Sequence, residues 1–419
     1  MTGQPDPVDL LVRAAWVCPI VAPPLRDGWI AVAGGRITAV GRGHDAPPAR
    51  AVREAGAAAL LPGLVNAHTH LELSWLRGRV PPSADFLAWV GRLMALRRSV
   101  EDGDDPAVAG PVQDAIAEAA ASGTVAIGDI ANALITPRFL AEAGMPAVVF
   151  HELIGFRVTD GAAAVASARA RHGDLASNGV RITVAPHAPF SVSAELFRAI
   201  RDAVCDGRRP TTSVHVGESP QEVQLLADGS GPWRARLGEL RAWRPDWQAP
   251  GCGPGDYLCD LGVLGPGALA VHGVQLTDRE LERLAASDVT LVTCPRSNRW
   301  VGVGDPPVAR FLASGVRLAV GTDSLASAPD LNLFGELAAL RQAAPDAPAR
   351  RLLAAATLGG AEALGLEAHF GSLEAGKRAV LVAVDLPAGT GDAEEALLGG
   401  VGPSCVRVLD LAGYDGTAV

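Results

Sequence analysis

Short apolar runs recur along the middle of the chain, and each is separated from the next by a segment long enough to form a helix. There are eight such runs, at Leu60–Ala67, Val125–Ile130, Ala147–Phe150, Arg181–Ala185, Thr212–Val216, Ala268–Val271, Val289–Thr293 and Arg317–Val320. A buried strand followed by a crossover helix, repeated eight times, is typical of a closed parallel barrel. The pattern therefore predicts an α/β protein with a parallel (β/α)8 TIM-like barrel.

The two ends of the chain follow a different pattern. Residues 9–58 contain short β-branched runs separated by turns, and the same character returns from about residue 371, in residues 378–384 and 405–411. Because chain ends often lie close together, we expect both ends to pair in one small β-sandwich domain. Residues 1–59 and 366–419 would then form the small domain, and residues 60–365 the barrel.

One connection, Pro220–Leu264, is longer than its neighbours and contains Trp233, Trp243 and Trp247. Its aromatic residues favour an insertion that packs on the barrel. The alternative is a lid over an active site, because long ordered loops are often functional. The sequence leaves the role of this connection open.

Composition excludes several classes of protein. No apolar stretch approaches the ~18 residues of a membrane-spanning helix, and the first ten residues carry no signal for secretion, so we expect a cytoplasmic protein with no membrane partner. Lys plus Arg number 36 against 46 for Asp plus Glu, a net charge of −10, which disfavours binding to nucleic acids. The six cysteines include no C-x-x-C pair, so reduced thiols are expected.

Polar residues suited to metal chemistry gather where the predicted strands end. His68 and His70 end the first barrel strand and, two residues apart, point to the same face. The other members of the set follow later strands: His187, His215, His272 and Asp323. Five of the nine histidines thus lie at the end of the barrel where such enzymes keep their chemistry. This placement favours a metal site over histidines that only complete a core.

Three neutral imidazoles and one carboxylate from this set form a site suited to zinc, with iron or manganese as alternatives. Such a metal activates water by lowering its pKa to about 7. Glu218 lies three residues after His215, where it can reach the reacting centre without being a ligand, as a general acid and base would. The alternative for Glu218 is an ordinary solvated loop carboxylate.

Several short motifs, taken together in their order along the chain, resemble those of a known family. The set comprises Leu61-Pro-Gly-Leu-Val-Asn-Ala-His-Thr-His70, Pro186-His187, His215-x-x-Glu218, His272-Gly273, Cys294-Pro-Arg-Ser-Asn298 and Gly321-Thr-Asp-Ser324. Over about residues 9–385 it resembles the amidohydrolase superfamily, in the branch of cytosine, guanine and adenosine-derivative deaminases and chlorohydrolases. Within that branch the motifs look most like the aminodeoxyfutalosine deaminase-like group.

The resemblance implies one metal ion, held by His68, His70, His215 and Asp323. It further implies that Asp323 accepts a proton from the metal-activated water, that Glu218 carries it to a ring nitrogen, and that His272 polarises the nucleophile. His187 would touch the substrate. Weaker candidates for the pocket wall are Glu72, Ser297 and Asn298, and Glu72 has the alternative of a structural carboxylate at the strand end.

Two related classes of site are excluded. Binuclear relatives that use a carboxylated lysine need that lysine on the fourth strand, and the only lysine of this chain is Lys377. The zinc deaminases built on H-x-E with P-C-x-x-C are excluded because no C-x-x-C exists.

We therefore predict a metal-dependent hydrolase of non-peptide C–N bonds, acting on a small heterocyclic molecule, and most specifically a deaminase of a purine-like base or nucleoside derivative. The alternative within hydrolases is opening of a cyclic amide or imide, or chlorohydrolase-type displacement on a ring. A third hypothesis, a barrel that only binds a ligand, is disfavoured because ligands and acid/base residues occur together. A homodimer is compatible with such a barrel.

Overall fold

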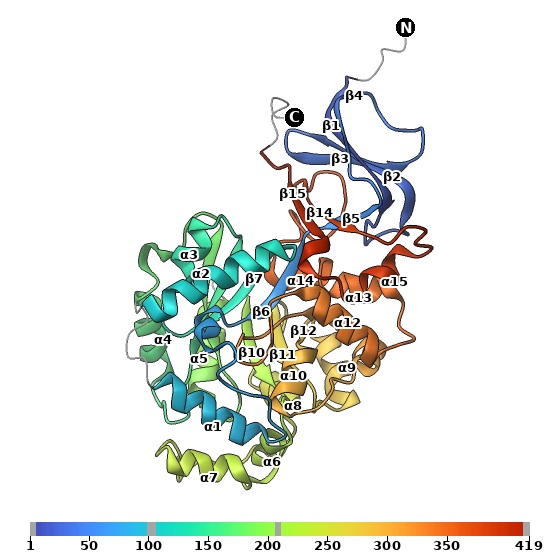
Figure 1. Ribbon diagram of the computed structural model, residues 1–419. Helices are drawn as coiled ribbons and strands as arrows, with labels where there is room; N and C mark the ends of the chain where they lie inside the picture. Colours follow the sequence, from blue (N-terminus) through green and yellow to red (C-terminus); the bar gives the residue numbers. More distant parts are fainter. Residues whose placement is uncertain (1–5, 99–105, 206–210, 414–419) are drawn as a thin grey trace.

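Two parallel sheets of four strands each form the centre of the molecule. The computed structural model describes residues 6–98, 106–205 and 211–413. The first sheet has the order β6 (Leu64–Thr69), β7 (Thr124–Ala131), β8 (Ala147–Leu153) and β9 (Val180–Pro186). The second has the order β10 (Thr212–Val216), β11 (Ala268–His272), β12 (Thr290–Thr293) and β13 (Arg317–Val320) (Figure 1). The predicted alternation of parallel strands and helices is confirmed.

Hydrogen bonds and a common core link the two sheets. The amide of Asp323, just after β13, donates to the carbonyl of His68 on β6 over 3.1 Å. The amide of His215 on β10 donates to the carbonyl of His187, just after β9, over 2.9 Å. Buried side chains from both sheets also pack in one cluster, which includes Val65, Phe150, Val271, Val292 and Ala319. The carboxyl ends of strands from both sheets are thereby brought together.

Helices alternate with these strands along the chain (Figure 1). Their bounds are α1 (Phe86–Arg97), α2 (Pro106–Ala121), α3 (Thr136–Glu142), α4 (Gly161–Ala170), α5 (Ala194–Val204), α6 (Pro220–Asp228), α7 (Pro232–Glu239), α8 (Pro254–Asp260), α9 (Asp278–Ala286), α10 (Pro295–Val301), α11 (Val308–Ser314), α12 (Leu333–Ala343), α13 (Ala349–Ala355), α14 (Leu358–Leu364) and α15 (Ala393–Leu397). None of the helices in these described segments is long and apolar enough to span a membrane.

Local sequence explains where several of these helices begin. The side chain of Asp85 accepts a hydrogen bond from the amide of Ala88 at the start of α1. At α9, Thr277 and Glu280 form a reciprocal capping box, as the order Thr-x-x-Glu predicts. Such caps satisfy amides that have no partner within the helix.

Seven strands from the two ends of the chain form a separate sheet. They are β1 (Val8–Val17), β2 (Leu25–Ala33), β3 (Arg36–Arg42), β4 (Ala49–Glu54), β5 (Ala58–Pro62), β14 (Val380–Asp385) and β15 (Val406–Asp410), in the order β15-β14-β5-β1-β2-β3 with β4 beside β1. Strands β5 and β14 pair antiparallel, which confirms that the two ends meet.

One predicted strand is wrong in its extent. The run Leu60–Ala67 is two strands, β5 in the small sheet and β6 in the central sheet, and the chain changes sheet at Gly63. A Cβ at Gly63 would lie 2.3 Å from a methyl group of Val125, so only glycine fits at this crossing. Because both strands are buried throughout, the apolar run continues across the change and hides it.

The contact between β6 and the end of β13 yields a testable prediction. A Cβ at Gly321 would lie 2.5 Å from the carbonyl oxygen of His68. We expect Gly321→Ala to separate the strands and to lower the free energy of unfolding by about 1–3 kcal/mol, measured by urea denaturation. The control is Gly110→Ala in α2, where a Cβ meets nothing within 4 Å. Equal stability of the two variants would contradict this role of Gly321.

Candidate metal centre and active site

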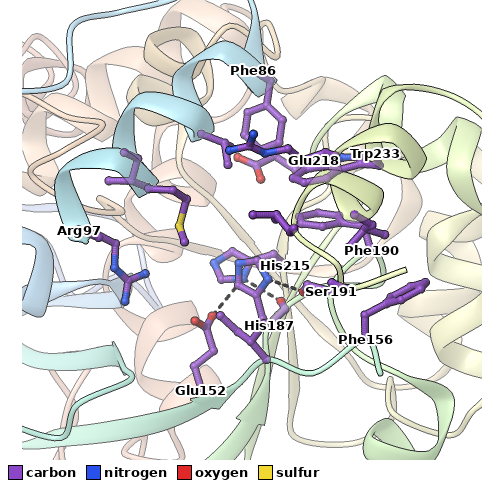
Figure 2. A pocket seen from close by; sticks show the side chains of 18 of the residues that line it. Phe86, Arg97, Glu152, Phe156, His187, Phe190, Ser191, His215, Glu218 and Trp233 are labelled. Atoms are coloured by element: carbon purple, nitrogen blue, oxygen red, sulfur yellow. Dashed lines mark hydrogen bonds and ion pairs between the residues drawn. The ribbon is translucent and has the colours of Figure 1, made fainter. Parts of the chain in front are cut away.

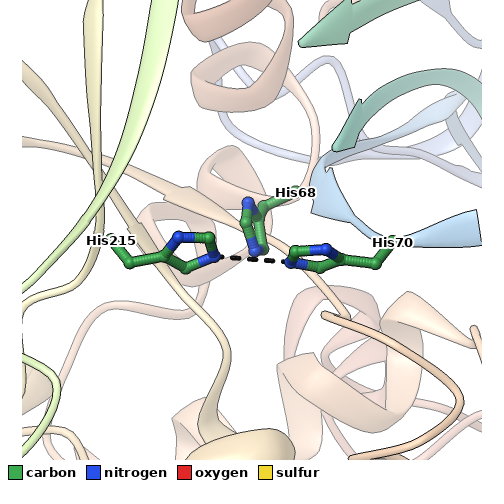
Figure 3. A group of neighbouring side chains, drawn as sticks. All are labelled: His68, His70 and His215. Atoms are coloured by element: carbon green, nitrogen blue, oxygen red, sulfur yellow. Dashed lines mark hydrogen bonds between the residues drawn. The ribbon is translucent and has the colours of Figure 1, made fainter. Parts of the chain in front are cut away.

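Three histidine rings face one another where β6 and β10 end. One ring nitrogen from each of His68, His70 and His215 lies within 4.8 Å of the other two (Figure 3). The Nε2 atoms of His70 and His215 are 3.4 Å apart. His68 is fully buried, and neither of its ring nitrogens has a hydrogen-bond partner among the described residues. A buried imidazole without a partner is costly unless a ligand satisfies it.

Asp323 completes this group from the end of β13. Its Oδ1 lies 3.6 Å from Nε2 of His70 and 4.0 Å from Nε2 of His68. Ser297 donates to the other carboxylate oxygen over 2.6 Å, which fixes the orientation of the carboxylate. Asp323 has a φ of 57°, a left-handed conformation that costs about 1–3 kcal/mol in a non-glycine residue. This strained backbone conformation occurs where the side chain of Asp323 is directed towards the histidines.

The hydrogen bond at the far side of His215 selects its tautomer. Its Nδ1 lies 2.9 Å from the carbonyl oxygen of His187, to which it donates. This leaves the lone pair on Nε2, the nitrogen that faces His70. Such a bond from the second ring nitrogen to a carbonyl is the usual support of a metal-binding histidine.

These residues fit a divalent metal ion. Burial lowers the pKa of His68 well below its ordinary value, and burial is also the largest cause of the lowered pKa of His70, so both rings are neutral. Neutral imidazoles with one carboxylate are a donor set that zinc prefers, and an ion between them would satisfy the otherwise unpartnered His68.

Glu218 lies beside this group without belonging to it. Its Oε1 is 3.6 Å from Nε2 of His272. Burial, and then the charge of Asp323, raises the pKa of Glu218 well above its ordinary value, so the carboxyl group can hold a proton near neutral pH. Asn298 donates to Nδ1 of His272 over 3.0 Å, so the proton of that ring is on Nε2, directed towards Glu218.

The same groups line a cavity of about 460 Å³, a volume suited to a small organic molecule. The polar residues that line it include His70, His187, His215, Glu218, His272 and Asp323, and most of the other lining residues are apolar. Figure 2 shows His187, His215 and Glu218 among them. Phe190 and Trp233 stack at 4.0 Å between ring centroids in one wall. At the rim, Ile154 and Leu240 are 56% and 41% exposed.

The long connection Pro220–Leu264 contributes to this cavity through α7, whose Trp233 and Leu237 form part of the wall. Farther along, Trp243 and Trp247 pack against Phe156. The sequence favours an insertion that packs on the rest of the protein, and Trp243 and Trp247 do so. Trp233 and Leu237 differ, because they also form part of the cavity wall.

Three of the residues predicted for the pocket wall lie outside it. Ser297 and Asn298 do not line the cavity, and instead hold Asp323 and His272 from behind. Glu72 is not in the cavity wall either. Its carboxylate accepts hydrogen bonds from the amides of Asn132, Ala133 and Ile135, so it stabilises the loop after β7, in line with the structural alternative.

Sequence reasoning missed Glu152, which lies in the cavity wall near the end of β8. The apolar run predicts a strand that ends at Phe150, whereas the strand continues to Leu153. A carboxylate two residues beyond an apolar run, where parallel strands end, is the signal that could have identified it.

Parallel sheets with a cluster of histidines and a carboxylate at the strand ends are typical of metal-dependent hydrolases. The sequence matches the model of the amidohydrolase family over residues 59–408, and the chain belongs to that family. It is an enzyme that hydrolyses carbon–nitrogen bonds other than peptide bonds.

Similar proteins include three deaminases. The aminodeoxyfutalosine deaminase of Deinococcus radiodurans is 31% identical over 359 residues, 82% of each chain. The structure of an adenosine deaminase from Xanthomonas campestris with bound zinc has a TM-score of 0.80 and 31% identity, and covers 98% of this chain and 93% of that one. The aminofutalosine deaminase of Helicobacter pylori in complex with methylthio-coformycin has a TM-score of 0.80 and 25% identity, over 93% and 95% of the two chains.

The cluster predicts a specific loss of metal. We expect His70→Ala to reduce bound metal from about one ion per chain to below a tenth, measured by elemental analysis of protein purified with added zinc, because a site with three remaining ligands binds far more weakly. His369→Ala is the matched control, since His369 is exposed and outside the cavity wall. Full metal content in His70→Ala would contradict the assignment.

Proposed function

We propose that this protein is a hydrolytic deaminase of an aminated purine-like base or nucleoside derivative. The observation that carries the proposal is the position of Glu218. It is a buried carboxyl group with a raised pKa that lines the cavity and faces His272, beside a metal-type cluster to which it does not belong. Such a group can deliver a proton to a bound heterocycle, which deamination requires.

His68, His70, His215 and Asp323 would hold one divalent ion, for which zinc is our first candidate and iron or manganese the alternatives. A metal ion bound there lowers the pKa of a coordinated water to about 7 and so supplies a nucleophile at neutral pH. The neutral state of the histidines and the fixed carboxylate of Asp323 support this ligand set.

The protein groups then move protons. As water adds to the ring carbon that bears the amino group, the carboxylate of Asp323 accepts one of its protons, and Glu218 gives its proton to the adjacent ring nitrogen. The Nε2 proton of His272 orients the attacking oxygen. The carbon–nitrogen bond breaks as the amino group takes the proton held by Asp323 and leaves as ammonia. The new hydroxyl group on the ring carbon returns its proton to the Glu218 carboxylate, so the product keeps a carbonyl group and a protonated ring nitrogen.

An adenosine-type substrate is favoured by the relatives and by the cavity. The similar proteins carry the names of adenosine, aminodeoxyfutalosine and aminofutalosine deaminases. Flat aromatic walls, with Phe190 and Trp233 stacked, suit a purine ring and an apolar substituent. His187 would contact this substrate from the cavity wall.

The architecture around the site is proposed in the same way. We infer that the two central sheets close into one eight-stranded barrel, supported by the hydrogen bonds at both seams, and that the small sheet folds into a β-sandwich. The division into residues 1–59, 60–365 and 366–419, a cytoplasmic location and a homodimer stay predictions from the sequence.

The proposal predicts the behaviour of Glu218→Gln. The amide cannot donate and recover the proton, so we expect ammonia release from the best substrate to fall by about 10²–10⁴-fold, with bound metal unchanged. The measurements are an ammonia assay over adenosine, 5′-deoxyadenosine, adenine, guanine and cytosine, paired with elemental analysis.

Glu282→Gln on the exposed side of α9 is the matched control and should retain the rate of the unmodified protein. Unchanged turnover in Glu218→Gln would refute the role of Glu218. A new carboxylate product without ammonia would instead identify a ring-opening hydrolase, and release of halide from a chlorinated ring would identify a chlorohydrolase.

A further inference from the structure

Glu222, in the first turn of α6, is a fully buried carboxyl group that the proposed proton transfers do not use. It is not among the residues that line the cavity, so any effect on a bound substrate passes through other residues. Its Oε1 accepts a hydrogen bond from the amide of Gly217 over 3.0 Å, and its Oε2 accepts one from the amide of Glu218 over 3.2 Å. One side chain thus holds the backbone that carries the proposed acid, Glu218.

The hydrogen bonds of Glu222 extend beyond the start of its own helix. Ser219 caps α6, and the order Ser-x-x-Glu commonly places the glutamate against the amide of the capping residue. At α9 this arrangement is present, because Oε2 of Glu280 accepts from the amide of Thr277 over 2.9 Å. Glu222 instead reaches the two amides that precede Ser219. Its target is therefore the turn that carries Glu218.

The other side of this turn is fixed to the segment that follows His272. The carbonyl of Gly217 accepts a hydrogen bond from the amide of Gln275 over 2.7 Å. The turn is thus held by a carboxyl group from α6 and by an amide from the loop after β11. Oε1 of Glu218 lies 3.6 Å from Nε2 of His272, and this separation depends on both attachments.

The turn has little freedom to adjust if Glu222 is changed. Gly217 has a φ of 60°, a left-handed conformation, and a Cβ there would lie 2.8 Å from Cδ2 of Leu276. Gly217 and Glu218 are both buried, so their amides need acceptors from the protein. Replacement of one oxygen of Glu222 leaves one of these amides without its acceptor, and we expect the turn to move as a result.

We propose that Glu222 is a positioning residue for the deamination, which sets the place of Glu218 relative to His272 and the bound ring through the amides of Gly217 and Glu218. This rests on the proposed function, because Glu222 acts on the proton transfer that Glu218 performs there. Such a residue affects the rate of the reaction and leaves the binding of substrate nearly unchanged, since an acid must lie within hydrogen-bond reach of the atom that it protonates.

The test is a double-mutant cycle in the metal-loaded enzyme, with the substrate that releases ammonia fastest. Glu222→Gln keeps one oxygen acceptor and turns an NH2 group towards the second amide, so we expect kcat to fall about 10- to 100-fold while KM changes less than about threefold. In the Glu218→Gln background the same substitution should change kcat less than about twofold, because the effects of residues that act as a unit are not additive. Elemental analysis should find equal metal content in all of these proteins.

Two further variants separate position from stability. Glu280→Gln alters a buried carboxyl group that binds the amides of Thr277 and Gly255, so it should lower the free energy of unfolding in urea and leave kcat unchanged within about twofold. Gly217→Ala strains the turn while Glu222 stays in place, so it should lower kcat in the presence of Glu218 and have little effect in the Glu218→Gln background. This variant decides the question if Glu222→Gln does not fold.

Additive losses in the cycle would overturn the proposal and assign Glu222 to general stability. An unchanged kcat in Glu222→Gln would remove it from the reaction, and a raised KM with an unchanged kcat would assign it to substrate binding. If the unmodified protein releases no ammonia, or if Glu218→Gln retains the full rate, the proposed function fails instead, which is distinct from additive losses in a working deaminase.

Discussion

The seam between β6 and the end of β13 is the constraint on which the site depends. There the amide of Asp323 donates to the carbonyl of His68, and the hydroxyl of Thr69 donates to the carbonyl of Asp323 over 2.8 Å. The side chain of Asn66 binds Thr322 across the same gap. These bonds fix the two strand ends against each other. The histidines at the end of β6 therefore lie beside the carboxylate of Asp323, although His68 and Asp323 are 255 positions apart in the sequence.

Burial sets the chemistry of the groups collected there. Removal from water lowers the pKa values of His68 and His70 and raises that of Glu218, so the histidines keep their lone pairs and the acid keeps its proton. Neutral ligands and a protonated acid in one dry cavity are what a metal-assisted hydrolysis needs. The apolar walls that we propose for substrate binding would therefore also prepare the proposed catalytic groups.

Much of this was predictable from the order of residues, because the parallel strands are buried and the candidate site residues stand at their ends. The strands Thr212–Val216 and Arg317–Val320 have the predicted bounds, and the histidines that follow the strands do meet. The change of sheet at Gly63 was not predictable from apolarity, since both strands are equally buried. The resemblance makes Glu72 a candidate for the pocket wall, yet its carboxylate accepts hydrogen bonds from loop amides, which is the structural alternative.

The sequence by itself determined the alternation of strands and helices and the residue types that are available to a metal site, because periodicity and residue type are local properties. Only the tertiary structure decided which oxygen or nitrogen of each residue is free. Asn132 occupies one oxygen of Glu152 and leaves the other, and the carbonyl of His187 selects the tautomer of His215. Those choices depend on hydrogen bonds between distant segments, whose geometry exists only after the chain has folded.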